Sequence, residues 1–125
     1  LDQGVEFVLS SLDLMSGGEI YVPKIPSMKI TDFINSFCSD KKLEEIGIRP
    51  GEKLHESLIN EDEISHAYEY ENMYMIIDPQ YDHKELENVY PKIKKINEMK
   101  KYSSDLADRL SISELKGLIQ NSGFL

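Results

Sequence analysis

The stretch AYEYENMYMII at residues 67–77 decides the fold, because its aromatic, methionine and β-branched side chains favour a strand over a helix. Asp78 and Pro79 follow directly and predict the end of this strand. We expect a single strand whose large side chains pack in an ordinary core. The alternative is that the same tyrosines and methionines form a stacking platform for a ligand.

Upstream of this strand, the sequence predicts a helix followed by a shorter strand. Gly17 and Gly18 predict the end of the helix, and residues 19–22 have the β-favouring composition of a strand. Pro23 and Pro26 then halt this strand in a constrained loop. Within the helix, apolar residues recur at helical spacing at Leu1, Val5, Val8, Leu9 and Leu12.

Two more helices and an extended segment are expected between these two strands. Thr31 or Asp32 is a suitable cap for a short helix that carries Phe33 and Phe37 on its apolar side. The extended segment contains Ile46 and Ile48. The turn Arg49-Pro50-Gly51-Glu52 follows it and predicts the start of a helix over residues 52–58.

The C-terminal part gives a weak signal and then a clear one. Residues 80–101 are rich in charge without a clear apolar stripe, so we expect irregular structure or a peripheral helix there. Ser111 and Glu114 form the pattern of a capping box. The helix that they start has an apolar face at Ile112, Leu115, Leu118 and Ile119. Helices separated by three short strands predict an α/β fold, a small mixed lobe that completes a larger domain.

The charge balance argues against several classes of protein. The chain has 23 acidic and 14 basic residues, and the resulting net charge of -9 disfavours sequence-independent binding to nucleic acid. No apolar run approaches the roughly 20 residues needed to cross a bilayer, so we expect no membrane partner. We interpret the one basic cluster as a solvated face rather than a site for nucleic acid or a membrane surface: Lys92, Lys94, Lys95, Lys100 and Lys101.

Length and cysteine content indicate the kind of protein. A chain of 125 residues fits one domain. Its single cysteine, Cys38, cannot form an internal disulfide, and no segment resembling a signal peptide precedes the first helix, so we expect a cytoplasmic protein. Because the sequence starts at Leu1 inside an expected helix, we expect it to be the C-terminal part of a longer protein.

The turn Arg49-Pro50-Gly51-Glu52 is the strongest candidate for a ligand site. It presents one of only two arginines in the chain, with Glu52 three positions on, at the start of an expected helix. A guanidinium binds phosphate bidentately, and a carboxylate accepts hydrogen bonds from vicinal hydroxyls such as those of ribose. The pair suits a nucleoside diphosphate. The alternative is that Arg49 and Glu52 pair with each other or cap the helix.

A rival interpretation is a dimetal site. The pairs Glu52–His55 and Glu63–His66 repeat the Glu-x-x-His spacing of carboxylate-bridged dimetal bundles. Such a site needs glutamates from two further long helices, and the strand-like residues 67–77 leave no four-helix frame. We therefore expect solvent-facing or capping histidines, with no metal site. We also expect no catalytic residue, because no serine or cysteine has the setting of a nucleophile.

Two long motifs, in this order, resemble the C-terminal region of bacterial UDP-N-acetylglucosamine 4,6-dehydratases, which belong to the extended short-chain dehydrogenase/reductase superfamily. The first is GGEIYVPKIPSMKI at residues 17–30, and the second is GIRPGEKLHE at residues 47–56. The segment YSSD at residues 102–105 and the expected helix over residues 110–119 are also similar to that family's tail. The resemblance is weakest over residues 80–101.

The resemblance implies a longer, homo-oligomeric enzyme of polysaccharide and nonulosonic-acid biosynthesis. Its N-terminal Rossmann domain binds NADP or NAD, and residues 1–125 are its substrate-binding lobe. In that family a hydride leaves C4 of UDP-N-acetylglucosamine, water is lost across C5 and C6, and the hydride returns to C6. The inverting branch also epimerises C5. The resemblance further implies that Arg49 contacts the UDP diphosphate and Glu52 the uridine ribose.

The departures from that family also carry expectations. Its cofactor-binding glycine motif, its catalytic lysine and the acid/base partners have no counterpart here, so we expect this segment alone to bind no cofactor and to be inactive. The motifs at residues 22–26 and 49–52 favour the inverting branch. The alternatives are a UDP-sugar 4-epimerase of capsule or O-antigen synthesis and a non-catalytic binding or interaction module.

Overall fold

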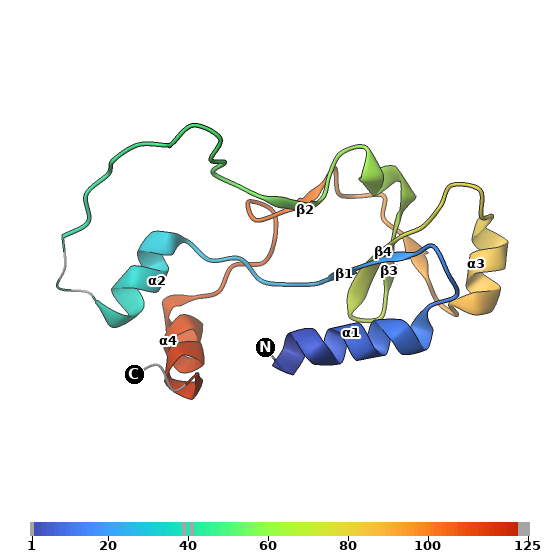
Figure 1. Cartoon of the computed structure of the whole chain (residues 1–125), viewed down its shortest axis with the longest axis horizontal. Coiled ribbons are helices and arrows are strands. Elements are labelled where there is room, and N and C mark those ends of the chain that lie inside the picture. The colour runs from blue at the N-terminus through green and yellow to red at the C-terminus, as the bar shows by residue number, and fades with distance from the viewer. Residues whose placement is uncertain (1, 39, 41, 123–125) are drawn as a thin grey trace. The chain divides into compact units, whose positions relative to one another are not determined.

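The computed structural model describes residues 2–38, 40 and 42–122 (Figure 1). The chain forms two compact units. The sheet unit comprises Leu1–Lys24 and Ser57–Tyr102, and the helix-pair unit comprises Ile25–Glu56 and Ser103–Leu125. Helices and short strands are mixed along the chain, which confirms the expected α/β class.

Residues 67–77 form a hairpin, so the prediction of a single strand is wrong. Strands β3 (Ala67–Tyr70) and β4 (Met73–Ile76) run antiparallel, with Tyr70 opposite Met73. The chain reverses over residues 71–72, where Glu71 adopts a positive φ of 49°. Two polar residues in the middle of an apolar stretch are the turn signal that the single-strand prediction overlooked.

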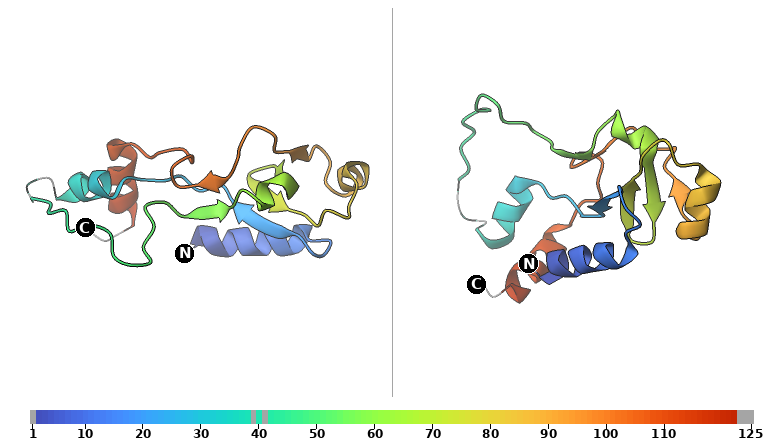
Figure 2. Two further views of the ribbon diagram at one scale, coloured as in Figure 1. Left: turned by 90° about the horizontal axis from the view of Figure 1, so that it is seen from above. Right: turned by 45° about the vertical axis from the view of Figure 1, so that its right-hand side comes forward.

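The hairpin forms the centre of a four-stranded antiparallel sheet. Strand β1 (Ile20–Pro23) pairs with β4, and β5 (Lys94–Lys95) pairs with β3, giving the order β1-β4-β3-β5. Figure 2 shows β1 beside the hairpin from two directions. The strand expected over residues 19–22 is thus present. A 3₁₀-helix, Glu63–His66, leads into β3, while β2 (Ser57–Ile59) and β6 (Tyr102–Ser103) form a separate two-stranded sheet.

The core of the sheet unit surrounds Met75, whose side chain is fully buried. Helix α3 (His83–Val89) contributes Leu86 to this core, and Tyr90 and Ile93 follow it. A helix is thus present within residues 80–101, as expected, but the expectation that it is peripheral is wrong, because Leu86 is buried. Leu86, Tyr90 and Ile93 follow one another at intervals of four and three positions, but the charged residues between them obscure this apolar spacing in the sequence.

Helix α1 (Asp2–Leu14) forms as predicted and ends before Gly17 and Gly18, but it packs through a different face. Phe7 and Leu14, seven positions apart, pack against the core of the sheet unit. The predicted face is 51–58% exposed at Val5, Val8, Leu9 and Leu12, and Leu1 lies outside the described residues. Both sides of this helix carry large apolar residues, so helical spacing alone could not identify the packed side.

The helix-pair unit packs α2 (Ile30–Phe37) against α4 (Ile112–Asn121). The predicted capping box of Ser111 and Glu114 is present, and Leu115 from the predicted apolar face is 1% exposed. Helix α2 starts before Thr31 and Asp32, so neither residue is its N-cap as predicted. No helix within the described residues is both long enough and apolar enough to span a bilayer.

Replacing Met75 with alanine should lower the free energy of unfolding of the sheet unit by about 2–5 kcal/mol, because the truncation leaves a cavity in a close-packed core. Urea unfolding followed by circular dichroism measures this change. Val8→Ala is the control, because Val8 is 56% exposed and the substitution should change stability by less than about 0.5 kcal/mol. Equal losses for the two variants would contradict this assignment of the core.

Candidate functional site

The Arg49 turn closes through its own backbone. The Glu52 amide donates a hydrogen bond to the Arg49 carbonyl at 3.0 Å, which is the bond of a four-residue β-turn. Gly51 has a φ of 86°, which an L-residue with a side chain rarely adopts. Proline at the second position and glycine at positive φ at the third match the requirements of a type II turn.

The side chains of Arg49 and Glu52 meet on the outside of this turn. Glu52 Oε2 accepts a hydrogen bond from the Arg49 backbone amide at 3.0 Å, and Arg49 Nη1 lies 3.7 Å from Glu52 Oε1. The two side chains remain 73% and 52% exposed. The pairing expected from the alternative interpretation is therefore present. Because exposed ion pairs contribute little stability, a phosphate group can replace Glu52 as the partner of Arg49 at small cost.

The helix expected over residues 52–58 is absent, so the prediction of a helix N-terminus beside Arg49 is wrong. Residues 53–56 are irregular, and Ser57 begins strand β2. The strand buries Ile59 completely, whereas Leu54 is 77% exposed and gives a helix no apolar face to bury. Residues 46–48 likewise form no strand. An anion at this turn would thus depend on side chains rather than on helix N–H groups.

A second contact joins this segment to a distant part of the chain. His55 Nδ1 lies 3.1 Å from Ser104 Oγ, 49 positions further on. The Ser104 amide donates to the Glu56 carbonyl at 3.0 Å. Sequence reasoning considered His55 only as half of a Glu-x-x-His pair and missed this contact. The available signal was that both segments belong to the motifs that resemble one enzyme family.

The two Glu-x-x-His pairs have unrelated surroundings. Glu52 pairs with Arg49, while Glu63 Oε2 accepts a hydrogen bond from the Asn60 amide at 3.0 Å. His66 ends the 3₁₀-helix. Within the described part of the chain, no three histidine, cysteine, aspartate or glutamate side chains come together as a metal site.

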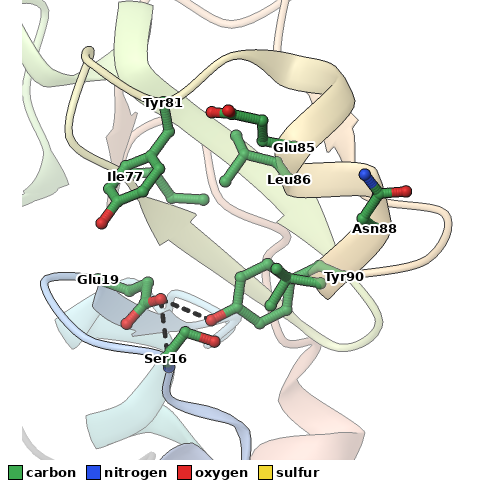
Figure 3. Close-up of a pocket in the computed structure, with 9 residues that line it drawn as sticks. Ser16, Glu19, Ile77, Tyr81, Glu85, Leu86, Asn88 and Tyr90 are labelled. Carbon is green, nitrogen blue, oxygen red and sulfur yellow. Dashed lines mark hydrogen bonds between the residues drawn. The ribbon is translucent and has the colours of Figure 1, made fainter.

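The sheet unit contains a separate pocket of about 290 Å³ (Figure 3). Ile77, Leu86 and Val89 provide apolar lining, and Tyr81 and Tyr90 add aromatic rings. Glu19 also lines the pocket, with three neutral donors on its carboxylate: Tyr90 Oη at 2.6 Å, the Gly17 amide at 2.8 Å and the Ser16 amide at 3.3 Å.

The hydrogen bonds to Glu19 stabilise the charged form of its carboxyl. Partial burial raises the pKa of the Glu19 carboxyl, but the hydrogen bonds from Tyr90 and the nearby amides outweigh it and lower the pKa overall. The Tyr90 hydroxyl also lies 3.3 Å from Tyr21 Oη. Burial, together with this contact to Tyr90, raises the pKa of Tyr21. In its charged form, Glu19 thus stabilises the connection between α1 and β1.

The described residues do not fit a dinucleotide cofactor. Such a cradle needs a glycine-rich turn that leads from a strand into a helix. Here Gly17 and Gly18 lead from helix α1 into strand β1, which is the reverse order. Gly47 and Gly51 lie in the irregular segment around Arg49.

Residues 1–78 match a family model described as "Polysaccharide biosynthesis protein". The match covers more than half of the chain and includes the Arg49 turn. The chain belongs to the polysaccharide biosynthesis protein family. This assignment covers both long motifs from which the resemblance was recognised.

Individual relatives agree with the family. An inverting UDP-N-acetylglucosamine 4,6-dehydratase of Campylobacter jejuni is 53% identical over 76 residues, 61% of this chain and 23% of that protein, which confirms the recognised resemblance. A UDP-glucose 4-epimerase of Rickettsia bellii is 30% identical over an alignment of 129 residues, 100% of this chain and 38% of that protein. The X-ray structure of Pen from Bacillus thuringiensis matches with a TM-score of 0.78 and 29% identity over 99% of this chain and 37% of that one. The chain thus spans less than two-fifths of the length of each of these proteins.

Removing the Tyr90 hydroxyl should raise the pKa of Glu19 towards its ordinary value. Because the pKa of Glu19 is lowered by folding, its carboxylate stabilises the fold above the unfolded pKa, and this contribution is lost as the pH falls through the folded pKa. Tyr90→Phe should therefore lower stability at neutral pH and reduce the further loss on acidification. An NMR titration of the Glu19 carboxyl and unfolding at neutral and acidic pH measure both effects.

Tyr81→Phe is the matched control, because Tyr81 lines the same pocket and makes no recorded hydrogen bond to Glu19 within the described residues. It should leave the Glu19 titration unchanged. An unchanged titration in Tyr90→Phe as well would show that the tyrosine hydroxyl does not set the pKa of Glu19.

Proposed function

We propose that this chain is the substrate-binding part of a longer UDP-N-acetylglucosamine 4,6-dehydratase that inverts C5. The observation that carries this proposal is the 53% identity to the Campylobacter jejuni enzyme of that name. In the proposed complex, the Arg49 guanidinium binds the diphosphate and the Glu52 carboxylate binds the ribose hydroxyls of UDP. The family to which the chain belongs supports a role in surface-polysaccharide synthesis.

The exposed turn supports these two roles. Arg49 and Glu52 are held close together by the backbone of the turn, yet their side chains are more than half exposed. A guanidinium that moves from the carboxylate to a phosphate exchanges one charged partner for another and gains a bidentate geometry. The carboxylate that it leaves is then available to accept hydrogen bonds from two neighbouring hydroxyls.

The remaining chemistry is assigned to the part of the longer enzyme outside these 125 residues. That part would hold NADP or NAD in a Rossmann domain of the extended short-chain dehydrogenase/reductase type and supply the catalytic residues. The proposed whole is a cytoplasmic homo-oligomer, with a nucleotide sugar as its ligand and neither nucleic acid nor a membrane as a partner. The isolated chain should have no lyase activity.

A second candidate is a UDP-sugar 4-epimerase. The Rickettsia bellii UDP-glucose 4-epimerase is less similar, at 30% identity, but its alignment spans the whole chain rather than 61% of it. Both candidates bind the same nucleotide diphosphate, so the Arg49 turn does not distinguish between them. The product does: a dehydratase yields a 4-keto-6-deoxy sugar nucleotide, and an epimerase yields the C4 epimer with its C6 hydroxyl retained.

Replacing Arg49 with alanine in the longer enzyme should weaken UDP binding by about 1.5–3 kcal/mol, because the diphosphate loses a charged hydrogen-bond donor. Isothermal titration calorimetry measures the dissociation constant. Arg109→Ala is the matched control: it removes the other arginine of the chain, which is exposed, and should leave the affinity unchanged. An unchanged affinity in Arg49→Ala would contradict the proposed diphosphate contact.

Calorimetry of the isolated 125-residue chain with UDP separates the enzyme-lobe proposal from that of a free-standing binding module. Half of a binding site should give no measurable heat at micromolar protein, since the rest of the site lies outside these residues. Stoichiometric binding of UDP by the chain alone would instead support a self-sufficient module.

A further inference from the structure

His55 is the side chain near the Arg49 turn whose role the proposed function leaves open. Its Nδ1 lies 3.1 Å from the Ser104 hydroxyl, and its side chain is exposed. The neighbouring Glu56 carbonyl accepts a hydrogen bond from the Ser104 amide at 3.0 Å. His55 and Glu56 are therefore both hydrogen-bonded to Ser104, His55 through its side chain and Glu56 through its backbone carbonyl.

The hydrogen bond to Ser104 engages Nδ1 of the His55 ring and leaves Nε2 outside this contact. In the tautomer in which the Ser104 hydroxyl donates to Nδ1, the neutral imidazole carries its proton on Nε2. Within the described residues, no contact is recorded for Nε2. In this tautomer the ring is held through Nδ1, and its Nε2–H is available to bind an anion or a carbonyl oxygen.

The requirements of a diphosphate complement this arrangement. Arg49 alone supplies two parallel donors to one phosphate group, whereas a diphosphate has several charged oxygens to satisfy. Helix N–H groups do not provide further donors, because residues 53–56 form no helix. His55 follows Glu52 by three residues, a reach of at most about 11 Å along an extended backbone. His55 thus lies on the same short segment as the two residues assigned to the nucleotide.

We propose that His55 is a third ligand-binding residue of this site, held by Ser104 through Nδ1 and donating from Nε2 to the diphosphate of the sugar nucleotide. This inference rests on the proposed function, because the diphosphate is the ligand assigned to Arg49 there. Ser104 is a positioning residue: it orients the imidazole and makes no contact with the nucleotide.

The test compares UDP with uridine on the longer enzyme, with uridine affinity measured by displacement of bound UDP. His55→Ala should weaken UDP binding about tenfold or more and leave uridine binding unchanged, because uridine has no phosphate to lose a donor. His55→Gln keeps a side-chain N–H donor and should recover part of the loss. Ser104→Ala should give a smaller loss, again confined to UDP. His66→Ala is the matched control, because His66 belongs to the other Glu-x-x-His pair, and it should change neither affinity.

Three results would overturn the inference. If Arg49→Ala weakens UDP binding and His55→Ala does not, the proposed function stands and His55 has no role in binding. If His55→Ala weakens UDP and uridine binding equally, His55 serves only to hold the turn. If neither Arg49→Ala nor His55→Ala affects UDP binding, the proposed site itself fails. Thermal unfolding followed by circular dichroism confirms that each variant is folded.

Discussion

The positive φ of Gly51 is the constraint on which the candidate site depends. It lets the chain reverse within four residues, so that Arg49 and Glu52 lie together instead of on opposite sides of a strand. Proline at the preceding position restricts the backbone further and reduces the entropy lost when the turn forms. The turn needs no support from a following helix, which explains how the charged pair stays in register while both side chains remain exposed.

The site and the core are built on different principles. The sheet unit is stabilised by burial of large side chains around Met75, and the carboxylate of Glu19 is satisfied by neutral donors at the junction of α1 and β1. In the helix-pair unit, residues 55–56, which follow the Arg49 turn, are joined to Ser104 by two hydrogen bonds. Ile46, Ile48 and Leu54 are all more than 60% exposed. A segment with so little apolar burial retains the freedom to adjust to a charged ligand.

Sequence reasoning succeeded where local chemistry dominates. The turn at Pro50 and Gly51, the capping box of Ser111 and Glu114 and the helix break at Gly17 depend on neighbouring residues, and all three are present. It failed where distant contacts decide the outcome. A strand that buries Ile59 forms where a helix was expected after the turn. Helix α1 packs against the core of the sheet unit through Phe7 and Leu14 rather than through its predicted face. The contact between His55 and Ser104 spans 49 positions, and residue spacing gives no indication of such a pairing.

The central claim is that Arg49 and Glu52 exchange their mutual pairing for contacts to a nucleoside diphosphate. A crystal structure of the longer enzyme with UDP bound tests it most directly. The account predicts guanidinium nitrogens about 2.7–2.9 Å from phosphate oxygens, with the Glu52 carboxylate at the ribose hydroxyls. An Arg49 side chain still paired with Glu52, with the nucleotide bound elsewhere, would contradict it.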